Sequence, residues 1–269
     1  MTFKKIILYD EPSVPEINVP NLVKFLKQTL PVEVIVKDNF FKEFSTQQIQ
    51  KISESRIFEI NKPFQRLAAS QTDLELEEEF CKKSQIMEQT KKPEDVTNIS
   101  EVVMYDGFEI QKIIRDQLEI DDQILHVVLT NRLTCTYDES DFRYHGRAVI
   151  CANPAIISTT GIIEAPAKSK EFYIETMANK AQGLDIKSIK DKHKGEFLEY
   201  HDKRLSQVIE GYLLQVLFYV LTGGAFCNHL DCRLNNAHWQ KDLLRSQIEI
   251  RKLCDKHQKI LDSQRWFKC

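Results

Sequence analysis

The sequence lacks a long uninterrupted apolar run and an excess of charge of either sign. No stretch approaches the roughly 18 consecutive apolar residues that a membrane-spanning helix needs. The apolar residues near the N-terminus are followed at once by Asp10 and Glu11, so no secretion signal is predicted. The formal net charge is −3, so the chain as a whole is not predicted to bind a polyanion. We therefore expect a cytoplasmic protein with no membrane partner.

The composition is that of an ordinary soluble protein. Hydrophobic residues make up 42% of the chain, enough for a sizeable core, and charged residues make up 29%. A length of 269 residues suits one large domain or two small ones. No internal repeat is apparent, and nothing in the composition sets the oligomeric state.

Seven cysteines occur in a chain without a predicted secretion signal, and seven is an odd number. Reduced thiols are the default in such a chain, and clustered cysteines indicate a metal site before a disulfide. Four cysteines stand apart in the sequence and are predicted to be buried small hydrophobes or surface thiols. These four are Cys81, Cys135, Cys151 and Cys269.

The N-terminal part predicts a βαβ unit with a parallel strand pair. Its strand, helix and strand are expected at Lys4–Tyr9, Pro20–Leu30 and Val32–Val36. A further helix is expected over Thr46–Ser55, with Ser45 as its N-cap. We assign residues 1–67 to this N-terminal part of a single α/β domain.

Residues 68–100 differ in composition and are interpreted as an acidic helical insert followed by a linker. The acidic block consists of Asp73, Glu75, Glu77, Glu78 and Glu79. A charge run of this kind is usually a solvated helix face, which is the interpretation we adopt. A binding role for the acidic side chains is the alternative.

Residues 101–269 predict the remainder of a mixed β-sheet with packed helices. Helices are expected at Gly107–Leu118, Leu205–Leu221 and Ala237–Leu261, a strand at Gln123–Leu129, and apolar stretches at Arg147–Ala152 and Ala155–Ile163. Polar connections at Asp138–Tyr144 and Ser158–Gly161 are typical of turns and loops.

Three cysteines and a histidine near the C-terminus have the spacing of a zinc site. Cys227 and Cys232 form a C-x4-C turn just after a helix that ends at Gly223. Cys254 and His257 form a C-x2-H pair, and residues i and i+3 share one helical face. Four protein ligands leave no open position, so the predicted ion, one zinc, is structural.

Two alternatives remain open for this cluster. Either His229 or Asp231, which lie inside the C-x4-C turn, can replace one of the four ligands. The other alternative is that three thiols and a histidine fall close together by chance.

The order helix, glycine, C-x4-C, spacer and C-x2-H resembles the archaemetzincins, zinc metalloproteases with the signature HExxHxxGxxHC-x4-C. The family glycine falls on Gly223, and the structural-zinc cysteines fall on Cys227, Cys232 and Cys254. His257 stands where the family has its last cysteine. The resemblance implies a metzincin-like C-terminal half, residues 101–269, closed by a zinc-binding helix pair.

More of the chain, about residues 120 to 265, resembles a narrower archaeal group of metallopeptidase-like proteins. The residues that carry this resemblance are Arg143-Tyr144-His145, Ile156–Thr159, Glu164–Lys168, and Cys232–Leu234 leading to Asn236–Gln240.

Every catalytic position of the archaemetzincin signature is apolar in this chain. The two histidines of HExxH fall on Val216 and Val220, and the general-base glutamate falls on Leu217. The third zinc-binding histidine falls on Phe226. A zinc-activated water needs ligands and a base, so no catalytic residue is predicted. The resemblance then implies an inactive, zinc-stabilised relative that binds a peptide or a protein partner.

Arg143, His145, Glu164 and His238 are the candidates for a substrate or partner cleft outside the zinc ligands. An active metal-dependent hydrolase with a rebuilt site among them is the main alternative function. A solvated loop before a strand is the simpler interpretation of the segment around His145. A nucleic-acid accessory role is disfavoured, because the basic residues after Arg233 have no aromatic residues interleaved.

Overall fold

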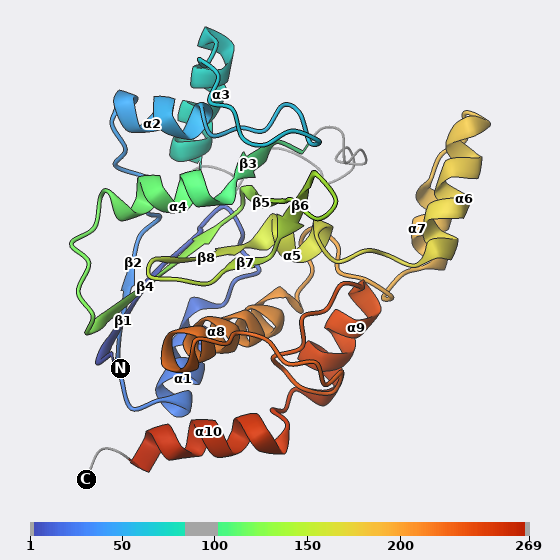
Figure 1. The fold of residues 1–269 in the computed structure, drawn as a ribbon. Helices are drawn as coiled ribbons and strands as arrows, with labels where there is room; N and C mark the ends of the chain where they lie inside the picture. The colour runs from blue at the N-terminus through green and yellow to red at the C-terminus, as the bar shows by residue number, and fades with distance from the viewer. Residues whose placement is uncertain (1–2, 84–101, 267–269) are drawn as a thin grey trace.

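The computed structural model describes residues 3–83 and 102–266. It has a mixed α/β fold in which helices pack on both faces of a five-stranded sheet, with a three-stranded sheet beside it (Figure 1). The strands are β1 (Lys5–Tyr9), β2 (Glu33–Lys37), β3 (Met104–Asp106), β4 (Ile124–Thr130), β5 (Leu133–Asp138), β6 (Arg143–Arg147), β7 (Val149–Ile150) and β8 (Ala155–Ser158). The predicted fold class is confirmed.

Ten α-helices and one π-helical segment, η2, lie within the described residues. They are α1 (Val19–Thr29), α2 (Thr46–Ser53), α3 (Gln71–Lys83), α4 (Gly107–Arg115), α5 (Thr159–Glu164), α6 (Lys170–Ala181), α7 (Lys187–Lys192), α8 (Leu205–Thr222), α9 (Gln240–Leu244), η2 (Arg245–Ile250) and α10 (Asp255–Trp266).

The larger sheet has the order β2-β1-β4-β8-β7, and all neighbours are parallel except β7, which pairs antiparallel with β8 at the edge. Both faces are covered, because α1 and α8 lie on one side and α2 and α4 on the other (Figure 1). In β1, Leu8 accordingly packs with α1 and α8, whereas Ile7 packs with α2 and α4. Burial on both faces explains why these strands are almost continuously apolar.

Helix α8 is the central helix of the fold, and all its residues from Leu205 to Phe218 are buried except Gln207 and Glu210. It ends at Gly223, whose φ of 77° is the left-handed conformation expected of a C-cap glycine. By length and composition alone α8 could cross a membrane, although Gln207, Glu210 and Gln215 interrupt its apolar residues, so it is not an uninterrupted apolar run. Since 61% of the helix is buried inside the fold, a core helix explains the same composition.

Two local predictions are corrected. Ser158–Gly161, predicted as a turn or loop, instead begins α5, because the Ser158 hydroxyl accepts a hydrogen bond from the backbone N–H of Gly161 at 2.8 Å and acts as the N-cap. The single helix predicted over Ala237–Leu261 is broken into α9, η2 and α10. Arg251, with a φ of 51°, ends η2 in a left-handed conformation.

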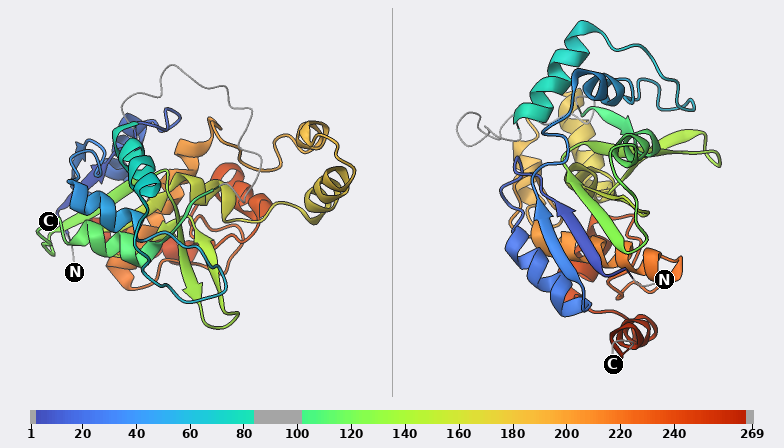
Figure 2. Two further views of the ribbon diagram at one scale, coloured as in Figure 1. Left: turned by 90° about the horizontal axis from the view of Figure 1, so that it is seen from above. Right: turned by 90° about the vertical axis from the view of Figure 1, so that its left-hand side faces the viewer.

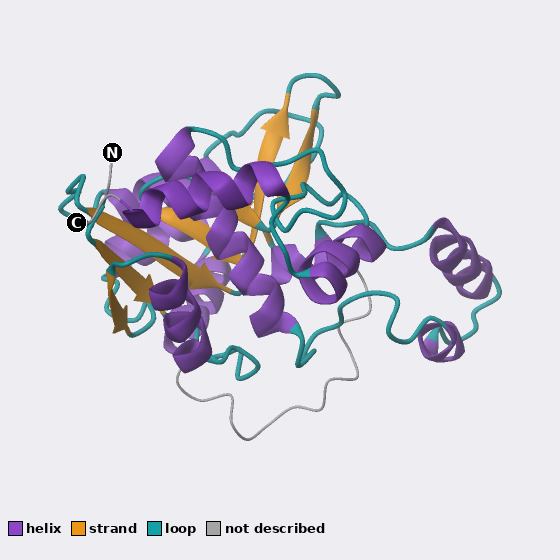
Figure 3. Cartoon of the chain, turned by 90° about the horizontal axis from the view of Figure 1, so that it is seen from below, coloured by secondary structure: helices purple, strands orange, loops and turns teal. Residues whose placement is uncertain are grey.

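Helices α6 and α7 form an arm that projects from the body of the molecule (Figure 1, the left view of Figure 2, and Figure 3). Helix α3 and helix α10 lie at opposite ends of the molecule, beyond α2 and α8 respectively (Figures 1 and 2). The linker predicted after α3 lies outside the described residues, as does Cys269.

Candidate metal centre and adjoining cleft

The four predicted zinc ligands converge at the C-terminal end of α8. The Sγ atoms of Cys227 and Cys254 lie 4.0 Å apart, and the Nδ1 atom of His257 lies 3.1 Å from Cys254 Sγ and 3.7 Å from Cys232 Sγ. All four ligand atoms lie within 4.8 Å of one another. His229 and Asp231 are not members of this group, and Asp231 instead pairs with Arg245.

Short backbone contacts bring the two halves of the cluster together. The N–H of Cys227 donates to the carbonyl of Leu234, and the N–H of Arg233 donates to the carbonyl of Lys252, each at 2.8 Å. The second contact ties the cysteine turn to the segment that follows η2. Cys254 belongs to that segment and directly precedes α10, whereas we expected it within a long helix. The break therefore sets Cys254 and His257 at the start of a helix.

The donor set and its spacing fit one zinc ion. Zinc bonds of about 2.3 Å to sulfur and about 2.0 Å to nitrogen place tetrahedral ligands about 3.5–3.8 Å apart. The observed separations of 3.1, 3.7 and 4.0 Å bracket that range. The backbone N–H of His229 lies 3.4 Å from Cys227 Sγ, and the backbone N–H of Cys254 lies 3.4 Å from Cys232 Sγ. Hydrogen bonds of this kind to the ligand atoms help to orient metal ligands.

Burial and backbone dipoles set the protonation of the ligands. Burial raises the pKa of Cys232 to about 12, against the opposing N–H groups of Cys254 and Leu234. Burial also acts to raise the pKa of Cys254, but the N–H groups around the start of α10 outweigh it and the pKa is lowered. Burial lowers the pKa of His257, which favours the neutral ring that binds metals.

A cavity of about 680 Å³ adjoins the cluster. One wall is the chain from Gly146 to Cys151, which includes the edge strand β7, and the opposite wall includes Tyr212 and Tyr219 of α8. The residues from Gly223 to Phe226, directly before the first cysteine, complete that wall. A volume of this size suits a small ligand or a short stretch of peptide.

The positions at which the archaemetzincin resemblance would place the catalytic signature hold apolar side chains. Val216 and Leu217 are 0% and 1% exposed and belong to the main core, and Val220 packs against the same core. Phe226 is 48% exposed and lines the cavity. These side chains offer neither a metal ligand nor a base.

The four cleft candidates do not come together. His238 is exposed and lines the cavity, whereas Arg143 and His145 lie on the hairpin of β5 and β6 and are not among the lining residues. Glu164, at the end of α5, interacts with Tyr200 and Lys168. Arg143–Arg147, for which a solvated loop was the simpler interpretation, is strand β6.

A second possible metal cluster lies on the same hairpin. Ligand atoms of Asp138, Asp141 and His145 lie within 4.8 Å of one another. His145 Nε2 already contacts both carboxylate oxygens of Asp141, at 2.8 and 3.0 Å, and Asp138 accepts hydrogen bonds from Ser140. The sequence spacing alone did not indicate this group.

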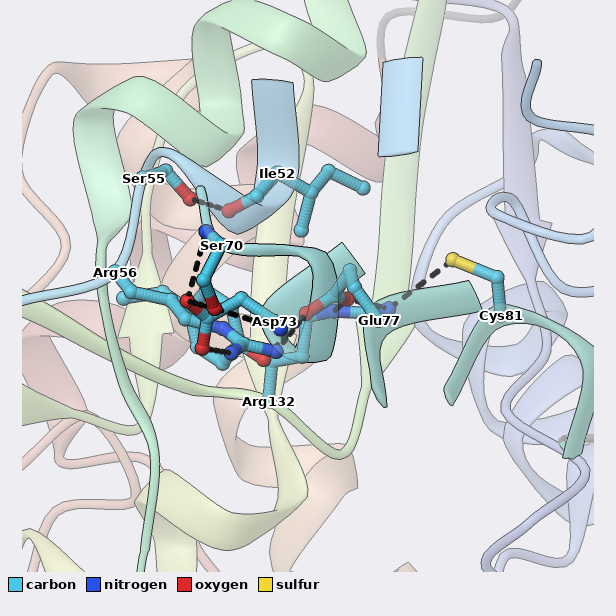
Figure 4. A network of polar contacts seen from close by, with 9 residues as sticks. Ile52, Ser55, Arg56, Ser70, Asp73, Glu77, Cys81 and Arg132 are labelled. Carbon is cyan, nitrogen blue, oxygen red and sulfur yellow. Dashed lines mark hydrogen bonds and ion pairs between the residues drawn. The ribbon is translucent and has the colours of Figure 1, made fainter. Parts of the chain in front are cut away.

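Sequence reasoning also missed a buried ion-pair network, shown in Figure 4. Glu77, in the acidic block that we interpreted as a solvated face, is 0% exposed. Its carboxylate accepts hydrogen bonds from Arg132 Nε at 2.9 Å and from Arg56 Nη2 at 3.0 Å, and from the hydroxyl of Tyr105 at 2.7 Å. Burial alone would raise the pKa of Glu77, but Arg132 outweighs it and the pKa is lowered.

Comparison with known proteins agrees with the expected metallopeptidase relationship. Residues 2–264 match the Probable metallopeptidase family (DUF6775). A comparison with curated proteins found no match. Among solved structures, the chain is similar to a zinc-dependent peptidase from Methanocorpusculum labreanum (strain Z), with 13% identity, a TM-score of 0.41, and coverage of 96% of this chain and 99% of that chain. Because the family match spans nearly the whole sequence, this protein belongs to the Probable metallopeptidase family.

Proposed function

We propose that this protein is a catalytically inactive, archaemetzincin-like relative of metallopeptidases that binds a peptide or a protein segment in its cleft. One observation carries the proposal. The Cys227, Cys232, Cys254 and His257 cluster is complete, while the neighbouring catalytic positions in α8 are buried valine and leucine. The scaffold thus keeps the residues that stabilise it and lacks those that activate water.

The ion in this proposal is one structural zinc. Four protein ligands close the tetrahedron, so no position remains for water or substrate. When bound, the zinc supplies a cross-link between the cysteine turn after α8 and the start of α10. Only reduced thiols can provide this site, which supports a cytoplasmic location.

The location of the cavity supports a peptide as the ligand. Strand β7 is at the edge of the sheet and forms part of the cavity wall. An edge strand has unpaired backbone groups, to which an extended peptide can add as a further strand. The opposite wall includes the aromatic rings of Tyr212, Tyr219 and Phe226. Aromatic rings can pack against the side chains of a bound peptide.

The proposal is tested on purified protein by metal analysis, peptide binding and peptide hydrolysis together. We expect about one zinc per chain, saturable binding of members of an extended-peptide library, and no cleavage of that library after prolonged incubation with added zinc. Metal-dependent cleavage that follows added zinc would contradict inactivity. Absence of binding across the library would contradict the peptide-binding role.

The hairpin cluster of Asp138, Asp141 and His145 favours a second candidate, a metal-dependent hydrolase with a non-standard site. Three ligands would leave coordination positions open for water, which the cysteine cluster does not. This candidate predicts hydrolysis that His145→Ala abolishes and that Cys254→Ser leaves intact in the folded fraction. Equal activity of His145→Ala and the unmodified protein would remove it.

A further inference from the structure

The cavity beside β7 and α8 has an uneven charge. Its lining residues include one arginine, Arg147, and one histidine, His238, but no aspartate or glutamate. The remaining lining residues are apolar, aromatic or neutral and polar. A cleft with a cationic group and no carboxylate favours ligands that carry a negative charge.

Arg147 is held in place but not neutralised. Its Nε donates to the hydroxyl of Thr136 at 2.6 Å, which fixes the plane of the guanidinium. Within residues 3–83 and 102–266, no carboxylate lies within 4.0 Å of it, and its two terminal nitrogens have no hydrogen-bond partner. Asp138, which interacts with it from further away, already accepts hydrogen bonds from Ser140 at 2.7 and 2.9 Å.

The opposite wall contributes the neutral hydroxyl of Tyr212 and the partial negative charge at the C-terminal end of α8. Tyr212 is 6% exposed, and burial raises the pKa of its phenol, so the hydroxyl stays protonated. The C-terminal end of α8 reaches the same wall at Gly223. A helix C-terminus carries about half a negative charge, less than the full positive charge of Arg147. Among the lining residues, the one full charge at neutral pH is therefore the positive charge of Arg147.

We propose that the cavity selects peptides that carry a carboxylate, which binds the free terminal nitrogens of Arg147. Two parallel N–H groups of a guanidinium match the two oxygens of a carboxylate. The carboxylate can come from a glutamate or aspartate side chain or from the C-terminus of the peptide. This inference rests on the peptide-binding role proposed above and adds the chemical class of the ligand.

The test uses zinc-loaded full-length protein and a hexapeptide that the unselected library shows to bind. Matched versions carry Glu, Gln or Lys at each position in turn, with a free or an amidated C-terminus, and fluorescence anisotropy measures each Kd. If a carboxylate forms a charge-assisted hydrogen bond with Arg147, one of two differences in Kd is expected. Either the peptide with Glu at the best position binds about tenfold tighter than the same peptide with Gln, or the peptide with a free C-terminus binds about tenfold tighter than the amidated peptide. That advantage is expected to shrink in 0.5 M NaCl, because salt screens the charge.

Variants of Arg147 separate this inference from the proposed function. Arg147→Gln is expected to remove the preference for the carboxylate while neutral peptides still bind, and Arg147→Glu is expected to reverse the preference toward Lys. Arg115→Gln, at an exposed arginine of α4 outside the lining residues, is the matched control and should keep the preference. Zinc content and melting temperature check that each variant is folded.

The outcomes are distinguishable. Binding that is equal for the Glu, Gln and Lys peptides, or a preference unchanged in Arg147→Gln, overturns the inference and leaves the peptide-binding role intact. Absence of binding by any peptide overturns both. A preference carried only by the free C-terminus, or only by a side chain, supports the inference and identifies the source of the carboxylate.

Discussion

Helices α3 and α10 lie at opposite ends of the molecule, and each buries two side chains among the residues described. Helix α3 buries Glu77 and Cys81, and α10 buries His257 and Leu261. Two buried side chains give little hydrophobic stabilisation, at most about 1.5–3 kcal/mol for each large apolar one. Both helices therefore depend on polar chemistry for their attachment, and the chemistry differs.

The attachment of α3 is complete within the chain, whereas the attachment proposed for α10 includes a metal. Glu77 meets the guanidinium groups of Arg56 and Arg132, and Asp73 also pairs with Arg56, so two carboxylates face two cations. Arg132 additionally lies over the ring of Phe41, at 4.3 Å from its centroid. The thiols of the α10 cluster have no such counter-charge among themselves. We therefore expect α3 to stay attached when a chelator removes the metal, and α10 to detach.

Loss of the metal is expected to have the largest effect. Cys232→Ser removes a fully buried ligand, so zinc content should fall from about one per chain to near zero and stability by several kcal/mol, since structural zinc binding is folding free energy. Hydrogen exchange should show lost protection in α10 and retained protection in α3. Cys135→Ala, a buried cysteine outside the cluster, is the control and should keep its zinc. Full zinc occupancy in Cys232→Ser would refute the assigned ligand set.

Breaking the network of Glu77 should come next in size. Glu77→Gln leaves two buried arginines without their shared carboxylate, and removing one partner of a buried ion pair costs about 3–5 kcal/mol. Urea unfolding measures this loss, and zinc content should not change. Glu75→Gln, on an exposed position of the same helix, should cost less than about 0.5 kcal/mol. Similar losses for the two variants would contradict the difference in burial.

Acid should separate the two attachments by pH. The folded-state pKa of Glu77 is lowered, so its contribution to stability is present above its unfolded pKa of about 4.3 and is lost only as pH falls through the lower folded value. Zinc ligands must be deprotonated. Protons therefore displace the metal at a higher pH than the pH at which Glu77 becomes protonated. On acidification, zinc release and loss of α10 protection should therefore precede loss of α3 protection. Simultaneous loss of protection in both helices would contradict two separate modes of attachment.

The smallest expected effect concerns the packing of η2, the segment that leads toward α10. A Cβ added at Gly211 of α8 would lie 1.7 Å from the side chain of Gln247, which is fully buried and donates to the carbonyl of Arg233 at 2.8 Å. Gly211→Ala should cost about 1–3 kcal/mol through overpacking and weaken zinc affinity. At Gly224 the nearest contact is 3.8 Å, so Gly224→Ala should be nearly neutral. Calorimetry and a competitive zinc chelator measure both effects.

The two attachments also differ in how far the sequence predicted them. Thiols have few alternative uses in a chain with no predicted secretion signal, so the spacing of Cys227, Cys232, Cys254 and His257 is enough to indicate one shared site. Glu77 stands among four other acidic residues, and nothing in its local sequence separates it from a solvated one. Arg56 and Arg132, which explain its burial, are 21 and 55 residues away.

The break at Arg251 shows a similar limit. The apolar pattern of Ala237–Leu261 favoured one helix, but the contact between Arg233 and Lys252 holds the chain in an irregular segment there. Helices α6 and α7 were not predicted, because α6 has no continuous apolar face and exposes Ile174 and Met177.

The sequence by itself indicated the N-terminal βαβ unit, the C-cap at Gly223 and the clustering of three cysteines with His257, because each follows from residue types at short spacing. Only the tertiary structure decided that Glu77 is buried, that His238 lines the cavity while His145 does not, and that Arg147 faces the cavity without a carboxylate. Burial and charge pairing depend on which distant segments meet. The neighbours that satisfy a charged side chain are set by the packing of the whole sheet and its helices.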